Sequence, residues 1–87
     1  MYSVVFTGQA SKDAKKIEQA GFKNKVIALI KIIKENPFQN PPPYEKLQGF
    51  QDVYSRRINI QHRLVYQVLD EGKHIKIIRM WTHYDKI

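Results

Sequence analysis

The sequence has no cysteine, and its 87 residues include only 4 glycines and 4 prolines. Without cysteine the chain cannot form a disulfide, a cysteine-ligated zinc site or a thiolate nucleophile. No run approaches the roughly 18 consecutive apolar residues of a membrane span. Residues 1–6 lack the basic and apolar regions of a secretory signal. These absences predict a protein of a reducing cytoplasm with no membrane partner.

Acidic residues are scarce as well, with 8 Asp and Glu against 15 Lys and Arg and a formal net charge of +7. The surplus is shared by both halves of the chain, so it is not a basic tail. An apolar content of 43% supplies one core, and 87 residues are too few for two. We therefore predict a single domain over residues 1–87 whose basic surface binds a polyanion, either nucleic acid or an acidic protein.

The N-terminal half predicts one strand and two helices. Residues 2–6 are rich in β-branched and aromatic side chains, and residues 7–11 offer several helix caps. A first helix follows, with Ala10, Ala14 and Ile17 on its apolar face and Asp13 among the residues that point away from it. Gly21 is a plausible stop. Asn24 is the expected cap of a second helix over residues 25–35, which Pro37 ends.

The C-terminal half predicts strands. After a proline-rich connector at 36–43, residues 45–47 can form a brief extended piece. Residues 53–60, 62–69 and 74–84 are predicted as longer strands, the last two joined by a hairpin turn at 70–73. The resulting order is β-α-α-β-β-β. We expect an α+β fold with a twisted, antiparallel-rich sheet and two helices packed on one face.

A few titratable and basic side chains could together cleave RNA without a metal. Alternation along the strands places basic groups beside apolar neighbours on the part of the sheet that the helices need not cover. Glu45 could remove a proton, Arg63 could stabilise charge on a phosphate and His83 could protonate the leaving oxygen. Tyr84 could supply a hydroxyl or a stacking surface. Arg56 and Arg57 point to opposite sides of their strand, so at most one of them can line such a site.

Each of these residues also has an ordinary structural interpretation. Glu45 could be a solvated loop acid, Arg63 a surface charge on a strand, and His83 a solvated side chain near the end of the chain. His62 could be a half-buried imidazole. The aromatic residues Tyr54, Tyr66 and Trp81 are interpreted as packing groups rather than as base-stacking groups.

Metal and cofactor sites are not predicted. The 3 histidines have no short ligand spacing, and few acidic residues are clustered, which disfavours zinc and magnesium. The glycines are scattered and form no phosphate-binding loop, and no Gly-x-Ser-x-Gly turn is present. We expect no cofactor.

One motif is far more specific than these patterns. Residues 54–66 read YSRRINIQHRLVY, and the last predicted strand ends in Thr82-His83-Tyr84. The combination resembles the YoeB/Txe family of bacterial toxin–antitoxin modules, within the RelE superfamily. The resemblance extends over essentially the whole chain, including the Asn-Pro-Phe connector at 36–38 and the Glu-x-Leu element at 45–47.

The resemblance implies a RelE-like fold, similar to small microbial ribonucleases, and a ribosome-dependent endoribonuclease (mRNA interferase) that cuts mRNA in the A site and arrests translation without a metal. By motif position, Glu45 would be the general base, Arg63 the phosphate-stabilising cation and His83 the general acid. Tyr84 would position the substrate. Lys46 and Arg57 would contact phosphates. Gln48 and Gly49 stand where some members of the family carry a basic residue.

The partners that the resemblance implies are the ribosome, mRNA and a cognate antitoxin of the YefM/Axe type with an acidic C-terminal segment, in the bacterial cytoplasm. A homodimer is also compatible with it. The alternative from another functional class is a non-enzymatic toxin of the same superfamily, such as the ParE-type toxins, which inhibit DNA gyrase by binding. A basic RNA-binding module that does not cleave is a third interpretation.

Overall fold

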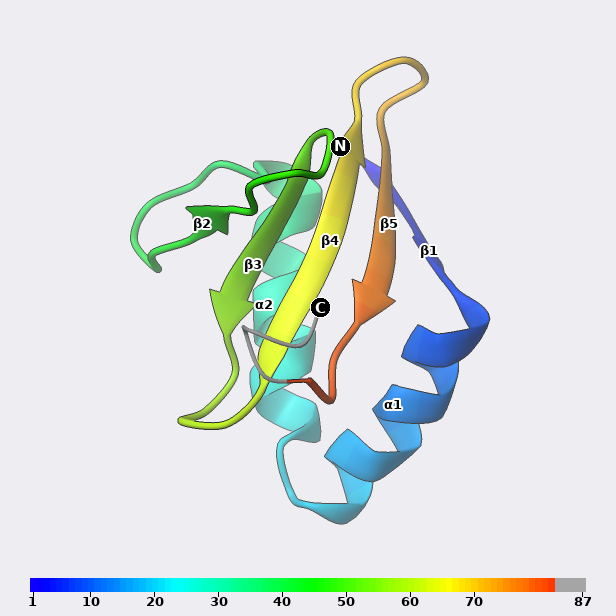
Figure 1. Cartoon of the computed structure of the whole chain (residues 1–87), viewed down its shortest axis with the longest axis vertical. Helices are drawn as coiled ribbons and strands as arrows, with labels where there is room; N and C mark the ends of the chain where they lie inside the picture. Colours follow the sequence, from blue (N-terminus) through cyan, green and yellow to red (C-terminus); the bar gives the residue numbers. More distant parts are fainter. Residues whose placement is uncertain (83–87) are drawn as a thin grey trace.

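The structure is a computed structural model and describes residues 1–82. This part of the chain contains two helices and five strands. The elements are β1 (Ser3–Phe6), α1 (Gly8–Gln19), α2 (Lys23–Glu35), β2 (Glu45–Lys46), β3 (Val53–Arg57), β4 (Arg63–Leu69) and β5 (His74–Arg79). They form one sheet in the order β1-β5-β4-β3-β2, in which β1 is parallel to β5 and the other pairs are antiparallel (Figure 1). The α+β fold predicted from the sequence is confirmed, and the brief extended piece is the edge strand β2.

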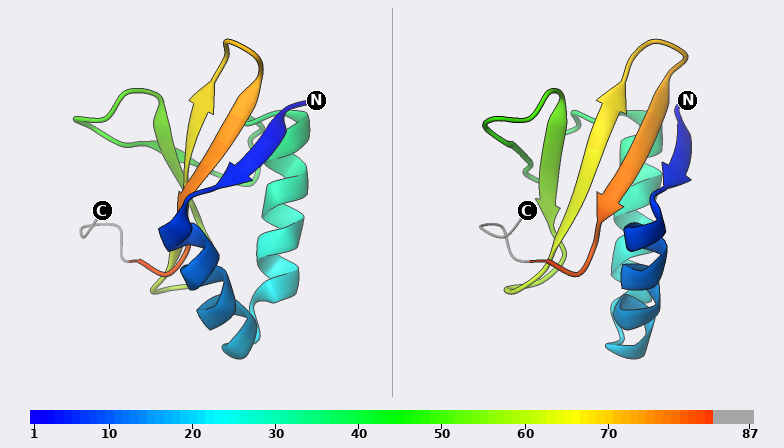
Figure 2. Two further views of the ribbon diagram at one scale, coloured as in Figure 1. Left: turned by 90° about the vertical axis from the view of Figure 1, so that its right-hand side faces the viewer. Right: turned by 45° about the vertical axis from the view of Figure 1, so that its right-hand side comes forward.

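Both helices lie on the same side of the sheet, as Figure 2 shows from two further directions. The main core fills the space between them and the sheet, and alternate residues of β3, β4 and β5 point into it. Its fully buried members include Ile17, Ile33, Leu64, Tyr66, Ile75 and Ile77. No helix within residues 1–82 has the length and apolar character needed to cross a membrane.

The ends of the helices match the predicted signals only in part. Thr7 caps α1, because its Oγ1 accepts a hydrogen bond from the Ala10 amide at 3.0 Å. Gly21 follows α1 with φ of +85°, a backbone conformation that glycine adopts without strain. The expected Asn24 cap is wrong. The chain enters α2 already at Lys23, with Phe22 at the cap position and no side-chain cap.

A buried arginine ties the proline-rich connector to β3. The Arg56 side chain is 1% exposed and lies on the helix side of the sheet. Its guanidinium donates hydrogen bonds to the carbonyls of Pro37, Gln39 and Pro42 at 2.6–3.0 Å and to the Tyr66 hydroxyl at 3.1 Å. Burial raises the pKa of Tyr66, and the nearby Arg56 charge opposes that rise. This network holds the segment that leads directly into β2.

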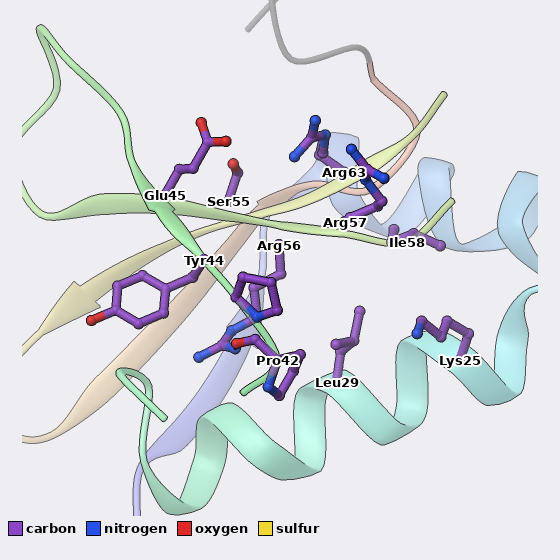
Figure 3. A pocket seen from close by; sticks show the side chains of 11 residues that line it. Lys25, Leu29, Pro42, Tyr44, Glu45, Ser55, Arg56, Arg57, Ile58 and Arg63 are labelled. Carbon is purple, nitrogen blue, oxygen red and sulfur yellow. The ribbon is translucent and has the colours of Figure 1, made fainter. Parts of the chain in front are cut away.

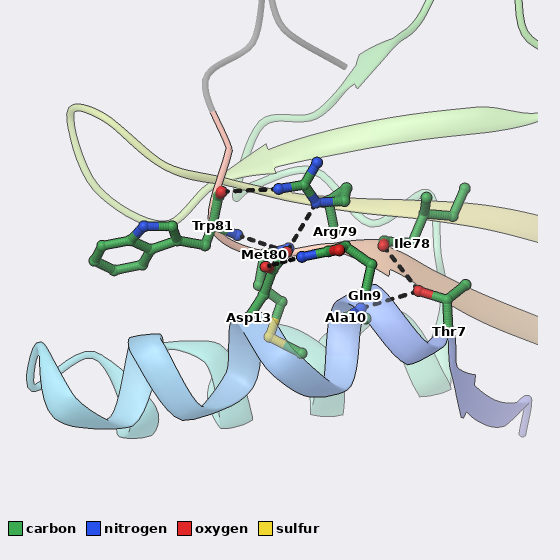
Figure 4. A network of polar contacts seen from close by, with 8 residues as sticks. All are labelled: Thr7, Gln9, Ala10, Asp13, Ile78, Arg79, Met80 and Trp81. Carbon is green, nitrogen blue, oxygen red and sulfur yellow. Dashed lines mark hydrogen bonds and ion pairs between the residues drawn. The ribbon is translucent and has the colours of Figure 1, made fainter.

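The last strand ends earlier than predicted, at Arg79 rather than at residue 84. Asp13 explains the difference, because its carboxylate accepts the backbone N–H groups of Met80 and Trp81 at 3.0 and 3.2 Å (Figure 4). These bonds turn the chain out of the sheet and toward α1. The prediction that Asp13 points to solvent is therefore also wrong, since its side chain is fully buried. Residues 83 and 84 of the predicted strand lie outside the described residues.

Candidate active site

A pocket of 330 Å³ opens at the edge of β3, between the start of β2 and helix α2 (Figure 3). Among its described lining residues are four cations, Lys25, Arg56, Arg57 and Arg63, and one carboxylate, Glu45. The described lining is therefore strongly positive and includes one candidate base. Such a charge balance favours an anionic ligand.

Glu45 and Ser55 project together from the sheet face opposite the helices. They are register partners on β2 and β3, so their side chains emerge next to each other (Figure 3). Glu45 is exposed, whereas Ser55 is buried, and its Oγ has no hydrogen-bond partner among the residues described. A small apolar cluster supports this face and consists of Leu47 just after β2, Val53 of β3 and Val65 of β4. The backbone that carries the Glu45 carboxylate is thus held by packing, and the carboxylate itself is accessible to a ligand.

Two arginines stand side by side on the same face. Arg57 at the end of β3 is paired in register with Arg63 at the start of β4, and Figure 3 shows their side chains next to each other. Two guanidinium groups at neighbouring positions on one face can donate hydrogen bonds to the same anion. The arrangement therefore has the chemistry of a phosphate site.

The pocket continues around the edge of β3 to the helix side. There Lys25 and Leu29 from α2 line it together with Pro42 and Tyr44. Sequence reasoning did not single out Lys25, although it lies four residues before the buried Leu29 and so on the same side of the helix. Arg56 lines the pocket as well, but its guanidinium is occupied by carbonyl groups. Arg57 lies on the open face and Arg56 on the helix side of β3, so the two point to opposite sides as predicted. The expectation that at most one of them lines the site is wrong, because the pocket passes around the edge of β3 and both line it.

The predicted site residues fall into three groups. Glu45, Arg57 and Arg63 come together at the pocket. Lys46 does not line it, because strand alternation directs Lys46 to the side opposite Glu45. His83 and Tyr84 lie outside the described residues. Thr82, the last residue before them, accepts a hydrogen bond through its carbonyl from the Arg63 amide at 3.1 Å, which brings the chain to the start of β4.

The aromatic residues pack as predicted. Tyr54 and Tyr66 belong to the main core. The His62 ring is buried and stacks on Trp81, with ring centroids 3.8 Å apart and an interplanar angle of 18°. The contact holds residue 81 against the beginning of β4. Over residues 1–82, no three histidine or acidic side chains gather closely enough to hold a metal ion.

Comparison with known proteins identifies the family. Residues 6–84 match the YoeB-like toxins of bacterial type II toxin–antitoxin systems. The chain belongs to this family. The resemblance inferred from the residue 54–66 motif is thereby confirmed. A search of curated proteins gives no match.

Solved structures of YoeB toxins have the same fold. A YoeB/ParE toxin from Agrobacterium tumefaciens is 29% identical over 94% of this chain and 99% of its own, with a TM-score of 0.85. A chain of the YoeB-YefM complex from Staphylococcus aureus is 38% identical over 97% of this chain and 99% of its own, with a TM-score of 0.79. The YoeB dimer from the same organism is 38% identical over 95% and 98%, with a TM-score of 0.82.

Proposed function

We propose that this YoeB-family toxin is a ribosome-dependent mRNA endoribonuclease, a single catalytic domain that cleaves mRNA in the ribosomal A site without a metal. Glu45 is the general base, Arg63 stabilises charge on the phosphate and His83 is the general acid. Arg57 is a second phosphate contact. Tyr84 positions the substrate. Lys46 remains a predicted phosphate contact that lies beyond the pocket.

The reaction uses the RNA's own 2′-hydroxyl as the nucleophile. Glu45 takes the hydroxyl proton, and the oxygen attacks the adjacent phosphorus. The bond from phosphorus to the 5′-oxygen breaks, and His83 gives that oxygen a proton. The products are a 2′,3′-cyclic phosphate and a 5′-hydroxyl. Arg63 and Arg57 offset the negative charge that develops on the phosphate oxygens.

One observation carries this proposal: the carboxylate of Glu45 and the paired cations Arg57 and Arg63 line the same pocket, and all three side chains project from the sheet face opposite α1 and α2. A base and a phosphate-binding pair on neighbouring strands are what RNA cleavage through the 2′-hydroxyl requires. The net charge of +7 also suits binding to rRNA and mRNA, which should weaken as salt increases.

The proposed protein partners are inferred from the basic net charge of this chain and from the assemblies of its solved relatives. The Staphylococcus aureus relatives are a YoeB-YefM complex and a YoeB dimer. We propose for this chain a YefM-like antitoxin whose acidic segment folds on the basic surface and covers the site, and a homodimer as a second assembly. Because the substrate is on ribosomes, the site of action is the bacterial cytoplasm.

The test is expression of the chain in bacteria, followed by primer extension on a translated message. The native chain should arrest growth and leave cuts at codons. Glu45→Gln or Arg63→Gln should abolish both, because proton transfer and charge stabilisation each contribute roughly 10²-fold or more to the rate. Glu35→Gln, which removes an exposed carboxylate at the end of α2, is the matched control and should remain toxic.

Two results would contradict the proposal. Full toxicity of both pocket variants would show that the pocket does not carry the reaction. DNA damage without mRNA cuts would favour a gyrase inhibitor of the ParE type, and the relative from Agrobacterium tumefaciens is described as a YoeB/ParE toxin.

A further inference from the structure

Asp13 is the most completely bonded carboxylate in the described part of the chain. Its Oδ2 accepts hydrogen bonds from the backbone amides of Met80 and Trp81 at 3.0 and 3.2 Å and from Arg79 Nε at 2.9 Å. Its Oδ1 accepts a bond from Gln9 Nε2 at 2.9 Å (Figure 4). We call these five residues the Asp13 network. It connects α1 to the segment that follows β5.

The Asp13 carboxylate is 0% exposed, so it can be ionised only if other groups stabilise its charge. Burial opposes the charged form, but the hydrogen bonds from the Met80 amide, Arg79, Gln9 and the Trp81 amide outweigh that effect and hold the pKa of Asp13 below its usual value. The amides of Met80 and Trp81 would otherwise be in a β-ladder or in water. The charge therefore stabilises one specific path of the backbone after Arg79.

That path leads to the proposed general acid. Trp81 is held by Asp13 on one side and by the His62 ring on the other, and the Thr82 carbonyl is bonded to the Arg63 amide. His83 is the next residue in the sequence. The last three described residues are thus fixed against both α1 and β4, at the point where the chain continues into His83.

We infer that Asp13 is a positioning residue, which sets the course of residues 80–82 and so the place from which His83 approaches the scissile phosphate. This inference rests on the proposed function, because it takes His83 as the general acid. An error of about 1 Å in the position of a catalytic group costs on the order of 10²-fold in rate. Asp13 touches no substrate and acts only through the backbone.

The experiment compares Asp13→Asn and Asp13→Ala with Thr7→Ala. Thr7 also joins α1 to β5, since its Oγ1 accepts from the Ala10 amide and donates to the Ile78 carbonyl at 2.9 Å. Its loss weakens the same helix–strand junction without touching residues 80–82. Thr7→Ala is therefore the control for loss of stability alone.

Single-turnover cleavage on programmed ribosomes and ribosome binding are measured for each variant. We expect Asp13→Ala to cleave roughly 10²-fold more slowly and Asp13→Asn less severely, with unchanged ribosome affinity. Thr7→Ala should melt at a lower temperature and cleave at the native rate. Equal loss of cleavage in Thr7→Ala would overturn the inference, and so would native rates in both folded Asp13 variants.

A double-mutant cycle with His83→Ala tests the route of the effect. Since Asp13 acts through His83, adding Asp13→Asn to His83→Ala should cause no further loss of rate. The same fold-loss in both backgrounds would contradict positioning of His83. An unaltered rate for His83→Ala alone would instead refute the proposed catalytic roles, which separates the two failures.

Two measurements do not depend on activity. Trp81 is the only tryptophan, so its fluorescence reports on this segment alone, and Asp13→Asn should shift the emission toward longer wavelengths while Thr7→Ala should not. In the native chain, the Met80 and Trp81 amides should exchange with deuterium as slowly as those of β5. Fast exchange of these amides would overturn the positioning role even if no Asp13 variant folds.

Discussion

Two buried charges hold the two irregular segments that flank the candidate site, and they are stabilised in different ways. Asp13 holds residues 80–82 and has a counter-ion, Arg79, in addition to backbone amides. Arg56 holds the proline-rich connector before Glu45. In the described part of the chain its hydrogen-bond partners are neutral: three carbonyls and the Tyr66 hydroxyl.

This difference predicts which of the two residues, Asp13 or Arg56, contributes more to the stability of the fold. Removing Asp13 frees two amides and an arginine that is 31% exposed, so water can reach part of the site. Removing Arg56 takes a donor from four acceptors. The Pro37 carbonyl and the Tyr66 hydroxyl are in buried hydrogen bonds, and the Gln39 and Pro42 carbonyls are in half-buried ones. Buried polar groups without partners are more costly than partly exposed ones. The Arg56 network is therefore expected to be essential for folding, and the Asp13 network for the geometry of the site.

The largest expected effect is that of Arg56→Met. Because the buried Tyr66 hydroxyl, the buried Pro37 carbonyl and two half-buried carbonyls lose a donor, the free energy of unfolding should fall by about 3 kcal/mol or more. The measurement is equilibrium denaturation in urea. Arg57→Met is the matched control one residue away, on the exposed side of the strand, and should change stability by no more than about 0.5 kcal/mol. Equal stability of the two variants would show that the Arg56 network is not essential for folding and would contradict the difference proposed between Arg56 and Asp13.

Asp13→Asn should have an intermediate, pH-dependent effect, about 2 kcal/mol at neutral pH from hydrogen bonds to a charged acceptor. The folded-state pKa of Asp13 is lowered, so the stabilisation is fully present above the unfolded pKa of about 3.9 and is lost as the pH falls through the folded value. Unfolding curves from pH 7 to pH 2 should therefore converge for the native chain and the variant. A constant difference over this range would show that Asp13 is not ionised in the fold.

Tyr66→Phe should have a smaller effect. The Tyr66 hydroxyl accepts a bond from Arg56 and donates one to the Pro37 carbonyl at 2.8 Å, so its removal should cost about 1 kcal/mol. Tyr54→Phe removes a hydroxyl that has no hydrogen bond to any residue in the range 1–82, and it should cost less. Thermal unfolding of both variants measures the difference. The reverse order would mean that the connector is held mainly by packing.

Ser55→Ala should change stability least, by less than about 0.5 kcal/mol, because the lost hydroxyl has no partner in residues 1–82. We expect it to lower cleavage nevertheless, since a group entering the pocket next to Glu45 could satisfy that hydroxyl. Paired measurements of melting temperature and single-turnover cleavage are the test. Native cleavage by a folded Ser55→Ala variant would exclude Ser55 from the site.

Strand alternation predicted correctly which side of the sheet several side chains face. It separated Arg56 from Arg57, and it placed basic groups on the sheet face that the helices leave open. These predictions succeeded because the side-chain period of a strand is a local property. The same alternation directs Lys46 away from its neighbour Glu45, and Lys46 does not line the pocket.

The errors at Asp13 and at the end of β5 have a long-range cause. Asp13 looks like a surface residue in its helix, because it lies among lysines on the polar face. Its partners Arg79, Met80 and Trp81 are 66 to 68 positions away, and only the folded chain brings them together. The same contacts end β5 at Arg79, so one unpredicted interaction accounts for both errors. Lys25 was overlooked for a similar reason, since α2 meets the edge of β3 only in three dimensions.

The amino-acid sequence alone determined the kind of protein: a basic α+β domain with its helices and strands close to the observed positions, because periodicity and turn residues act over a few neighbours. The tertiary structure decided which charges are buried. A carboxylate or guanidinium leaves water only where several distant donors or acceptors converge, and that convergence is a property of the packed elements rather than of any one segment.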